Sequence, residues 1–361
     1  MVLRFSVVFQ VTAFIAAFLL LTISEISAQH PKAQVGAYYF SGWNGKSRIH
    51  LTPSLIDSFS ERRPIWGWTS TLATMKTEID LAADNGLTFF NFCWYRPEKN
   101  QPDTNYLLNE SLGFYLRAPN RKRLKFCLMV ANHAGYAVGP AEWQQVTDQW
   151  LKLFKDSSYM KVDDKPLISF FSLYWLLKKF GSEQAIATAF NEFRARARAQ
   201  GLKGVTIAVC VNPDVWSVAT ARKVGIDVLT GYNYPNSGFK KNNENPSIDS
   251  LVIGSVYTWN NFRKFAYRYM PTVTLNWDPR PWAAYGKGYS NSKRYLDYSR
   301  VSVAASVKNA IKWLDNNPDK TVKERIIFLY AWNEYGEGAW LTPSTVKDRK
   351  LLLGLRQALS K

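Results

Sequence analysis

Residues of the kinds that build disulfide frameworks and metal centres are scarce in this chain. Its 361 residues include three cysteines, Cys93, Cys127 and Cys210, each within an apolar run. An odd number of widely spaced cysteines argues against a disulfide framework and favours buried free thiols. Only three histidines are present, so a histidine-rich metal site has little to be built from. The sequence therefore indicates neither a metal ion nor another cofactor.

Acidic residues are few relative to basic ones, 28 against 46, and the formal net charge is +18. No basic repeat, zinc-ligand spacing or single-strand-binding signature accompanies this charge, which argues against a nucleic-acid partner. An anionic glycan or an acidic cell envelope would explain the excess of basic residues, and a generic basic surface without a dedicated partner explains it equally well.

Long apolar runs are also missing, with one exception at the N-terminus. Residues 5–23 form an apolar run that follows a basic residue and precedes a small-residue pattern ending at Ala28, the layout of a cleavable secretory signal. We expect residues 1–28 to be removed, leaving a secreted or periplasmic protein that starts near Gln29 and has no stable membrane insertion. An uncleaved anchor is the alternative, although the run is close to the lower length limit for a membrane span.

No internal repeat, low-complexity linker or break in composition marks a second domain within residues 29–361. The chain is 47% apolar and 15% aromatic, which is ample for one large core. The sequence carries no signal for the oligomeric state.

Apolar runs typical of buried strands alternate with helical patterns along the whole mature chain. The expected strands are 35–40, 87–94, 124–131, 166–172, 204–211, 226–232, 271–275 and 326–331. The expected helices are 72–85, 105–116, 140–154, 182–201, 215–224, 257–269, 303–314 and 347–359. Eight alternating strands and helices predict a single (β/α)₈ TIM barrel with long loops at its C-terminal face. A doubly wound open sheet is the alternative, but the glycine-rich phosphate turn expected after its first strand is not found.

Aromatic and polar residues concentrate just after the expected strands, where barrels of this kind place their active sites. Aromatic faces and side-chain amides or acids are the groups that hold sugars. The candidates for substrate binding are Tyr38, Tyr39, Trp43, Trp94, His133, Asn212, Tyr232, Trp277, Asp278 and Asn333. Plainer roles are open for most of them: core packing for the aromatic residues, a structural role for His133, and an ion pair with Arg280 for Asp278.

The last expected strand ends in a turn that carries two acids. Glu334 and Glu337 stand three residues apart, with Gly336 and Gly338 beside Glu337. Glycine permits backbone angles that other residues resist, so the turn can aim both acids into one space. Two carboxyl groups are the minimum for cleaving a glycosidic bond, because one protonates the leaving oxygen while the other acts as base or nucleophile. A solvated acidic turn is the alternative, although three large aromatic residues crowd this segment.

Several of these segments resemble glycoside hydrolase family 99 and the related WbsX-like proteins, which are often labelled glycosyltransferases. The shared elements are residues 35–43, 92–95, 277–278 and above all Ala331-Trp-Asn-Glu-Tyr-Gly-Glu-Gly338. The resemblance extends over residues 34–345. It implies action on an α-mannosidic bond with retention of configuration. Glu334 would assist the sugar's own 2-hydroxyl to attack, and Glu337 would be the general acid and then the base. The family element often continues with an acid before proline, where this chain has Leu341-Thr342-Pro343.

Three functions are open from the sequence. The first is a secreted glycoside hydrolase that acts on a polysaccharide or oligosaccharide, with α-mannosides and endo action as options. The second is a glycosyltransferase of polysaccharide biosynthesis; the lack of an Asp-x-Asp motif and of a glycine-rich phosphate cradle, together with the export signal, argues against it. The third is a non-catalytic carbohydrate-binding barrel. A carbohydrate is the expected partner in each case.

Overall fold

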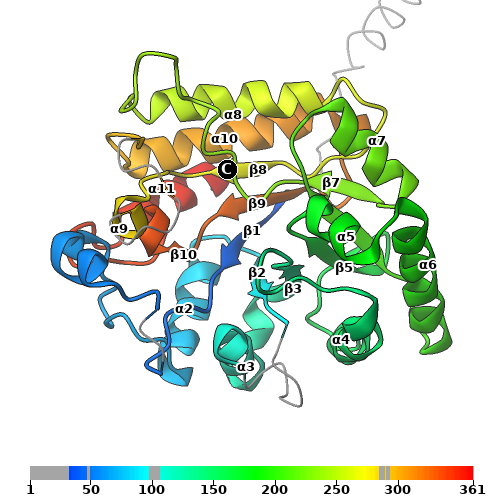
Figure 1. The fold of residues 1–361 in the computed structure, drawn as a ribbon. Helices are drawn as coiled ribbons and strands as arrows, with labels where there is room; N and C mark the ends of the chain where they lie inside the picture. Colours follow the sequence, from blue (N-terminus) through cyan, green and yellow to red (C-terminus); the bar gives the residue numbers. More distant parts are fainter. Residues whose placement is uncertain (1–31, 47–48, 97–105, 284–288, 290–292, 361) are drawn as a thin grey trace, which may run out of the picture. The chain divides into compact units, whose positions relative to one another are not determined.

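The computed structural model describes residues 32–46, 49–96, 106–283, 289 and 293–360. The expected signal segment, residues 1–28, lies outside these ranges. Parallel strands form a sheet in the order β7-β6-β5-β3-β2-β1-β9-β8, with helices around it (Figure 1). These strands are β1 (Gln34–Tyr39), β2 (Phe89–Trp94), β3 (Lys125–Val130), β5 (Lys165–Phe170), β6 (Thr206–Cys210), β7 (Val228–Thr230), β8 (Thr272–Thr274) and β9 (Ile326–Tyr330).

The two ends of this sheet meet, so the strands enclose a barrel. The backbone N–H of Leu229 in β7 donates to the carbonyl of Arg268 at 2.9 Å, and the N–H of Met270 donates back to Leu229 at 2.9 Å. The last strand, β9, pairs with the first, β1, in parallel register. The predicted TIM barrel is therefore confirmed, and the open doubly wound sheet is excluded.

Helices follow the strands as the apolar spacing predicts. Those of the outer ring are α2 (Leu72–Asp84), α3 (Glu110–Arg117), α4 (Pro140–Phe154), α6 (Glu183–Ala199), α7 (Val215–Lys223), α8 (Asp249–Phe262), α10 (Arg300–Asn316) and α11 (Lys350–Leu359). Ser182 caps α6 and Asp214 caps α7, each accepting a hydrogen bond from a backbone N–H in the first turn. No helix in the described ranges is long and apolar enough to cross a bilayer.

The helix expected at 257–269 is displaced, because α8 begins at Asp249 and ends at Phe262. Its buried face starts at Leu251 and includes serine, threonine and glycine, so the apolar spacing alone does not reveal its first two turns. Gly254 is needed there: a Cβ at this position would lie 2.1 Å from the carbonyl oxygen of Ser237.

Short elements fill the connections at the barrel's C-terminal face, and most of them carry no periodic sequence signal. They include η1 (Ser54–Ser58), η2 (Ser60–Arg62), η4 (Leu107–Asn109), α5 (Leu173–Phe180), α9 (Arg280–Ala283), β10 (Asn333–Glu334), η7 (Tyr335–Glu337) and β11 (Ala339–Trp340). Elsewhere are β4 (Lys161–Val162), η5 (Arg121–Arg123) and η6 (Pro318–Lys320). The cysteines are free thiols, with Cys93 and Cys127 buried and Cys210 half-buried.

Candidate active site

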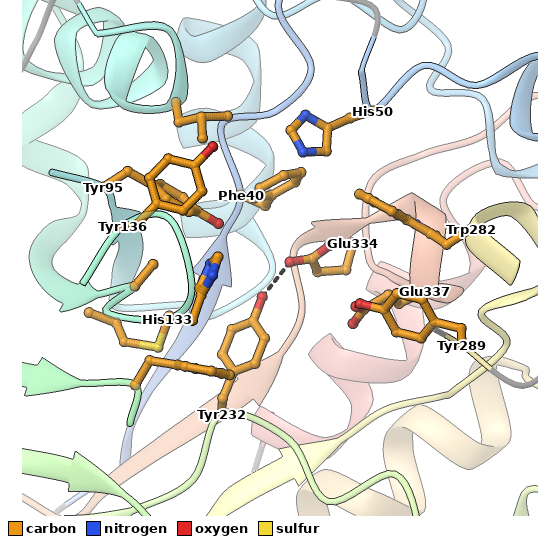
Figure 2. A pocket seen from close by; sticks show the side chains of 14 residues that line it. Phe40, His50, Tyr95, His133, Tyr136, Tyr232, Trp282, Tyr289, Glu334 and Glu337 are labelled. Atoms are coloured by element: carbon orange, nitrogen blue, oxygen red, sulfur yellow. Dashed lines mark hydrogen bonds between the residues drawn. The ribbon is translucent and has the colours of Figure 1, made fainter. Parts of the chain in front are cut away.

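A cavity of about 290 Å³ opens where the barrel strands end. Its wall is mainly aromatic and contains two acids (Figure 2). The lining residues are Phe40, His50, Tyr95, Leu108, Met129, Ala131, His133, Tyr136, Phe171, Tyr232, Trp282, Tyr289, Glu334 and Glu337. Phe40, Tyr95, Ala131 and Phe171 directly follow β1, β2, β3 and β5, so the C-terminal mouth of the barrel forms the site.

The turn after β9 folds back on itself, as its glycines predict. Asn333 and Glu334 pair antiparallel with Trp340 and Ala339, and Gly338 has a positive φ of 76°. Gly336 serves a different purpose, because a Cβ there would lie 1.2 Å from the indole nitrogen of Trp282. This turn brings Glu334 and Glu337 to one cavity, and Figure 2 shows both facing the space between the aromatic rings.

Glu334 is almost completely buried, with 5% of its surface exposed. Burial raises the pKa of its carboxyl group to about 7, although a hydrogen bond from the Tyr232 hydroxyl to Oε1 opposes the shift. Glu334 can therefore hold or release a proton near neutral pH.

Glu337 is half-buried, and two phenols donate to its carboxylate: Tyr289 to Oε1 and Tyr330 to Oε2. Burial raises its pKa to about 7, and the hydrogen bond from Tyr289 acts in the opposite direction. Both acids of the cavity thus titrate in the range in which one can be protonated while the other is charged.

Hydrogen bonds to residues at and just after the end of β1 hold the turn against the barrel. The amide of Asn333 accepts from the N–H of Phe40 at 2.8 Å and donates to its carbonyl at 2.9 Å. The indole of Trp43 donates to the Asn333 carbonyl at 2.7 Å, and the N–H of Trp332 donates to Tyr38 at 2.9 Å. Asn333 and Trp43 were both expected to bind substrate. Their side-chain polar groups make these hydrogen bonds within the protein, and neither residue lines the cavity.

A buried ion pair supports the other side of the turn. Arg62 is 2% exposed; it donates to the carbonyl of Tyr335 at 2.8 Å and to the carboxylate of Asp278 at 2.6 Å. The backbone N–H of Asp278 in turn donates to the carbonyl of Glu337 at 2.8 Å. Arg280 also binds the Asp278 carboxylate, at 2.7 Å, so the ion pair weighed against a substrate role is present. Asp278 therefore positions the turn from outside the cavity wall.

The remaining expected residues divide between the cavity wall and other places. Tyr232 and His133 line the cavity, and burial lowers the pKa of His133. Four others do not line it. Tyr38 is buried in the barrel with its hydroxyl bonded to the Gly231 carbonyl; Tyr39 faces α2; Trp94 packs edge-on against Trp150 of α4; and Trp277 is half-buried beside Tyr289. The alternation of side chains along β1 and β2 explains Tyr39 and Trp94, which point out of the barrel toward the helices, whereas Tyr38 points into the barrel.

Asn212 lies at the barrel mouth but in a different depression, together with Asn233 and Tyr234. Among the described residues, no three His, Cys, Asp or Glu side chains cluster as metal ligands would.

Several residues of the wall were not predicted from the sequence: Phe40, His50, Tyr136, Phe171, Trp282 and Tyr289. Tyr330, which bonds to Glu337, was not predicted either. Phe40 and Phe171 directly follow strands, and that position is a usable signal. His50, Trp282 and Tyr289 come from long connections, where nothing in the local sequence marks the side chain that reaches the cavity.

Behind the turn lies a third buried acid, Glu78 of α2. Its carboxylate accepts from the Tyr39 hydroxyl at 2.7 Å and from the Trp332 indole at 3.2 Å. Burial raises its pKa to about 7, and the two hydrogen bonds oppose the shift. Because Trp332 lies two residues before Glu334, this contact helps to fix the start of the turn.

Replacing Glu78 by Gln should make the stability of the protein less dependent on pH. In the unfolded chain this acid loses its proton near pH 4.3, whereas the folded protein keeps it until about pH 7. Its contribution to stability is therefore complete below the lower pKa and is lost as the pH rises through the higher one. Urea unfolding between pH 5 and 7 should give a slope shallower by up to about 1.4 kcal/mol per pH unit in Glu78→Gln.

The exposed Glu192 of α6 provides the control for this measurement. Glu192→Gln should keep the wild-type slope. An unchanged slope in Glu78→Gln would show that Glu78 does not retain a proton in the folded protein.

Known proteins resemble this chain in family and in fold. The family model described as Glycosyltransferase WbsX matches residues 69–354. An uncharacterized protein WxcX from Xanthomonas campestris pv. campestris (strain B100) is 24% identical over 229 residues, 58% of this chain. This chain spans only 29% of the length of that relative.

Two solved structures share the fold at low identity. A GH99 endo-alpha-mannosidase from Bacteroides thetaiotaomicron superimposes with a TM-score of 0.59 at 12% identity, over 90% of this chain and 95% of that one. A glycoside hydrolase-like protein superimposes with a TM-score of 0.61 at 14% identity, over 92% and 95%. The barrel of this chain therefore has the fold of the GH99 structure. Since the family model matches most of the chain, the protein belongs to the WbsX glycosyltransferase family.

Proposed function

We propose that the protein is a glycoside hydrolase and that Glu334 and Glu337 are its catalytic residues. The observation that carries this proposal is that both carboxyl groups line one aromatic-walled cavity at the mouth of the barrel. Aromatic rings contact the C–H faces of sugars, and a pair of acids supplies the proton transfers that glycoside hydrolysis requires.

The two acids would carry out separate proton transfers. The protonated acid gives its proton to the glycosidic oxygen while the bond from that oxygen to the anomeric carbon breaks. Following the resemblance to family 99, Glu334 takes the proton of the sugar's 2-hydroxyl, whose oxygen attacks the anomeric carbon. This attack closes a three-membered ring that contains the anomeric carbon, C2 and the 2-oxygen. Glu337, charged after giving up its proton, then removes a proton from the water that attacks the anomeric carbon and opens this ring. Glu334 returns its proton to the 2-oxygen, and the configuration is retained overall.

α-Mannosides are the first substrates to try, because the solved GH99 structure of the same fold is an endo-alpha-mannosidase. The proposed setting is outside the cytoplasm, as the expected signal at residues 1–28 indicates.

The direct test is to incubate residues 29–361 with α-mannans, bacterial envelope polysaccharides and anionic plant glycans. New reducing ends should form without any nucleotide sugar. If no glycan is cleaved while a nucleotide sugar is consumed and its sugar appears on an acceptor, the hydrolase proposal fails.

A glycosyltransferase is the second candidate, and the description of the matching family favours it. Under this alternative the same acids would serve a transfer reaction from an activated sugar. A non-catalytic sugar-binding barrel is separated from both by the lack of any turnover in the assay above.

The tyrosines of the cavity allow the roles of the two acids to be assigned. The Tyr289 hydrogen bond lowers the pKa of Glu337, and the Tyr232 hydrogen bond lowers that of Glu334. Tyr289→Phe should therefore raise the pKa of Glu337 and, if Glu337 is the acid, move the alkaline limb of the kcat/KM profile to higher pH. Tyr232→Phe should move the acidic limb to higher pH, because Glu334 must be charged to act as a base.

If Tyr289→Phe moved the acidic limb and Tyr232→Phe moved the alkaline limb, Glu334 would be the acid and Glu337 the base. Two unchanged profiles would contradict the claim that these carboxyl groups govern the pH dependence of the reaction.

A further inference from the structure

A second depression lies beside the cavity at the same end of the barrel. It has a volume of about 530 Å³ and is lined by residues that follow β6 and β7 and by residues of α8. Its lining consists of Asn212, Pro213, Asn233, Tyr234, Pro235, Asn236, Ser237, Tyr257, Thr258 and Asn261. We call it the asparagine groove.

The composition of the asparagine groove is unusual in a chain with a net charge of +18, because no lining residue is charged. Four of the ten residues are asparagines, and their amide groups have no hydrogen-bond partner within the described part of the chain. Each amide offers two donors and an acceptor, which is the pattern that a vicinal pair of sugar hydroxyls can use.

An exposed aromatic ring stands at the groove. Tyr257 of α8 lines it and is 68% exposed, with no ring contact to another described side chain. A large ring left in solvent beside free amides offers a flat surface for the C–H face of a sugar. The groove therefore combines the two kinds of group that bind neutral carbohydrates.

The asparagine groove adjoins the catalytic cavity through β7. Tyr232 is part of the cavity wall and bonds to Glu334, and the next residue, Asn233, lines the groove. A chain of sugars that leaves the cavity across the end of β7 would enter the groove without leaving the protein surface.

We propose that the asparagine groove is a second carbohydrate subsite, which holds a neutral stretch of the glycan whose glycosidic bond lies in the cavity. This inference rests on the proposed function, because the bond that is cleaved lies in the cavity. It adds that the substrate is a chain several sugars long, and that its recognition outside the cavity depends on hydroxyl groups and C–H faces instead of charge.

Two measurements test the groove with the triple variant Asn212→Ala/Asn236→Ala/Tyr257→Ala. The first is affinity electrophoresis in gels containing neutral yeast α-mannan, chosen because an anionic polymer would retard so basic a protein through charge alone. The second is kcat/KM on the cleaved polymer divided by kcat/KM on the shortest cleaved oligosaccharide. Ile253→Ala is the matched control, since this side chain is 71% exposed on the same helix, one turn before Tyr257, and does not line the groove.

Retardation of the wild type and the control by mannan, reduced in the triple variant, would support the groove even if no hydrolysis is found. A fall of about tenfold in the kcat/KM ratio, corresponding to 1.4 kcal/mol, would support it in an active enzyme. If all three proteins hydrolyse the glycan with the same kcat/KM ratio and are retarded equally, the groove is not a carbohydrate subsite, and the proposed function stands. A wild type that mannan does not retard and that cleaves no polymer would overturn both.

Discussion

Glu334→Gln and Glu337→Gln are each expected to lower kcat/KM by about 10²–10⁴-fold on the glycan that the wild type cleaves. Glutamine keeps the size of the side chain and can still accept from the cavity's phenols, but it cannot give or take a proton. Initial rates of reducing-end release, measured beside far-UV circular dichroism and thermal unfolding, check this expectation. The exposed Glu192→Gln should retain the wild-type rate and controls for the change of charge.

The two variants should differ on an aryl glycoside with a good leaving group. Such a substrate needs little protonation, so the variant of the acid should recover part of its rate and the variant of the base should not. The resemblance to family 99 predicts recovery for Glu337→Gln. Full activity of either variant on the natural linkage would remove that residue from the mechanism.

Asp278→Ala is expected to have the largest effect on stability, lowering the free energy of unfolding by about 3–5 kcal/mol. The variant leaves the buried guanidinium of Arg62 without its close carboxylate at 2.6 Å. It also loosens the segment whose backbone holds Glu337, so activity should fall as well. Urea denaturation at pH 7 measures the first effect.

Arg280→Ala provides the matched control, because Arg280 binds the same carboxylate from a side chain that is 35% exposed. Its loss should cost about 0–1 kcal/mol. Equal destabilisation by the two variants would contradict the importance assigned to the buried pair.

The loss of stability caused by Asp278→Ala should become smaller as the pH falls. Burial by itself would raise the pKa of Asp278, but the guanidinium groups of Arg280 and Arg62 outweigh burial and hold the pKa below its ordinary value. The stability that the charged carboxylate adds is present above the unfolded pKa, about 3.9, and is lost as the pH falls through the lower folded value. The difference between wild type and variant should therefore shrink below about pH 4.

The barrel could be predicted from the sequence because its strands are buried on both faces and leave continuous apolar runs. Runs such as Ile326–Tyr330 stand out from the spaced apolar pattern of the helices between them. The helix starting at Asp249 was misplaced because tertiary packing tolerates serine and glycine on its buried face. The connections at the barrel mouth have no period, so their short helices could not be found.

The turn that carries the two acids was predicted because it follows a buried strand and contains glycines, whereas most of the cavity wall around the acids was not predicted. A strand end marks where a residue lies, but not on which face its side chain points. Tyr38 and Tyr39 are neighbours in sequence, yet the first points into the barrel and the second toward Glu78. Arg62, which binds the turn at Tyr335 from 273 residues away in sequence, is one arginine among many in a long loop, and only the fold reveals its role.

The proposed reaction is the cleavage of a glycosidic bond by the two carboxyl groups of one cavity. Proton NMR time courses of a glycan with the wild type and with Glu334→Gln/Glu337→Gln, in buffer free of nucleotide sugars, test it most directly. New anomeric signals should grow only with the wild type, while the double variant still broadens the signals of the glycan by binding it. Equal growth of new signals in both samples, or broadening without any new signal in either, would contradict the claim.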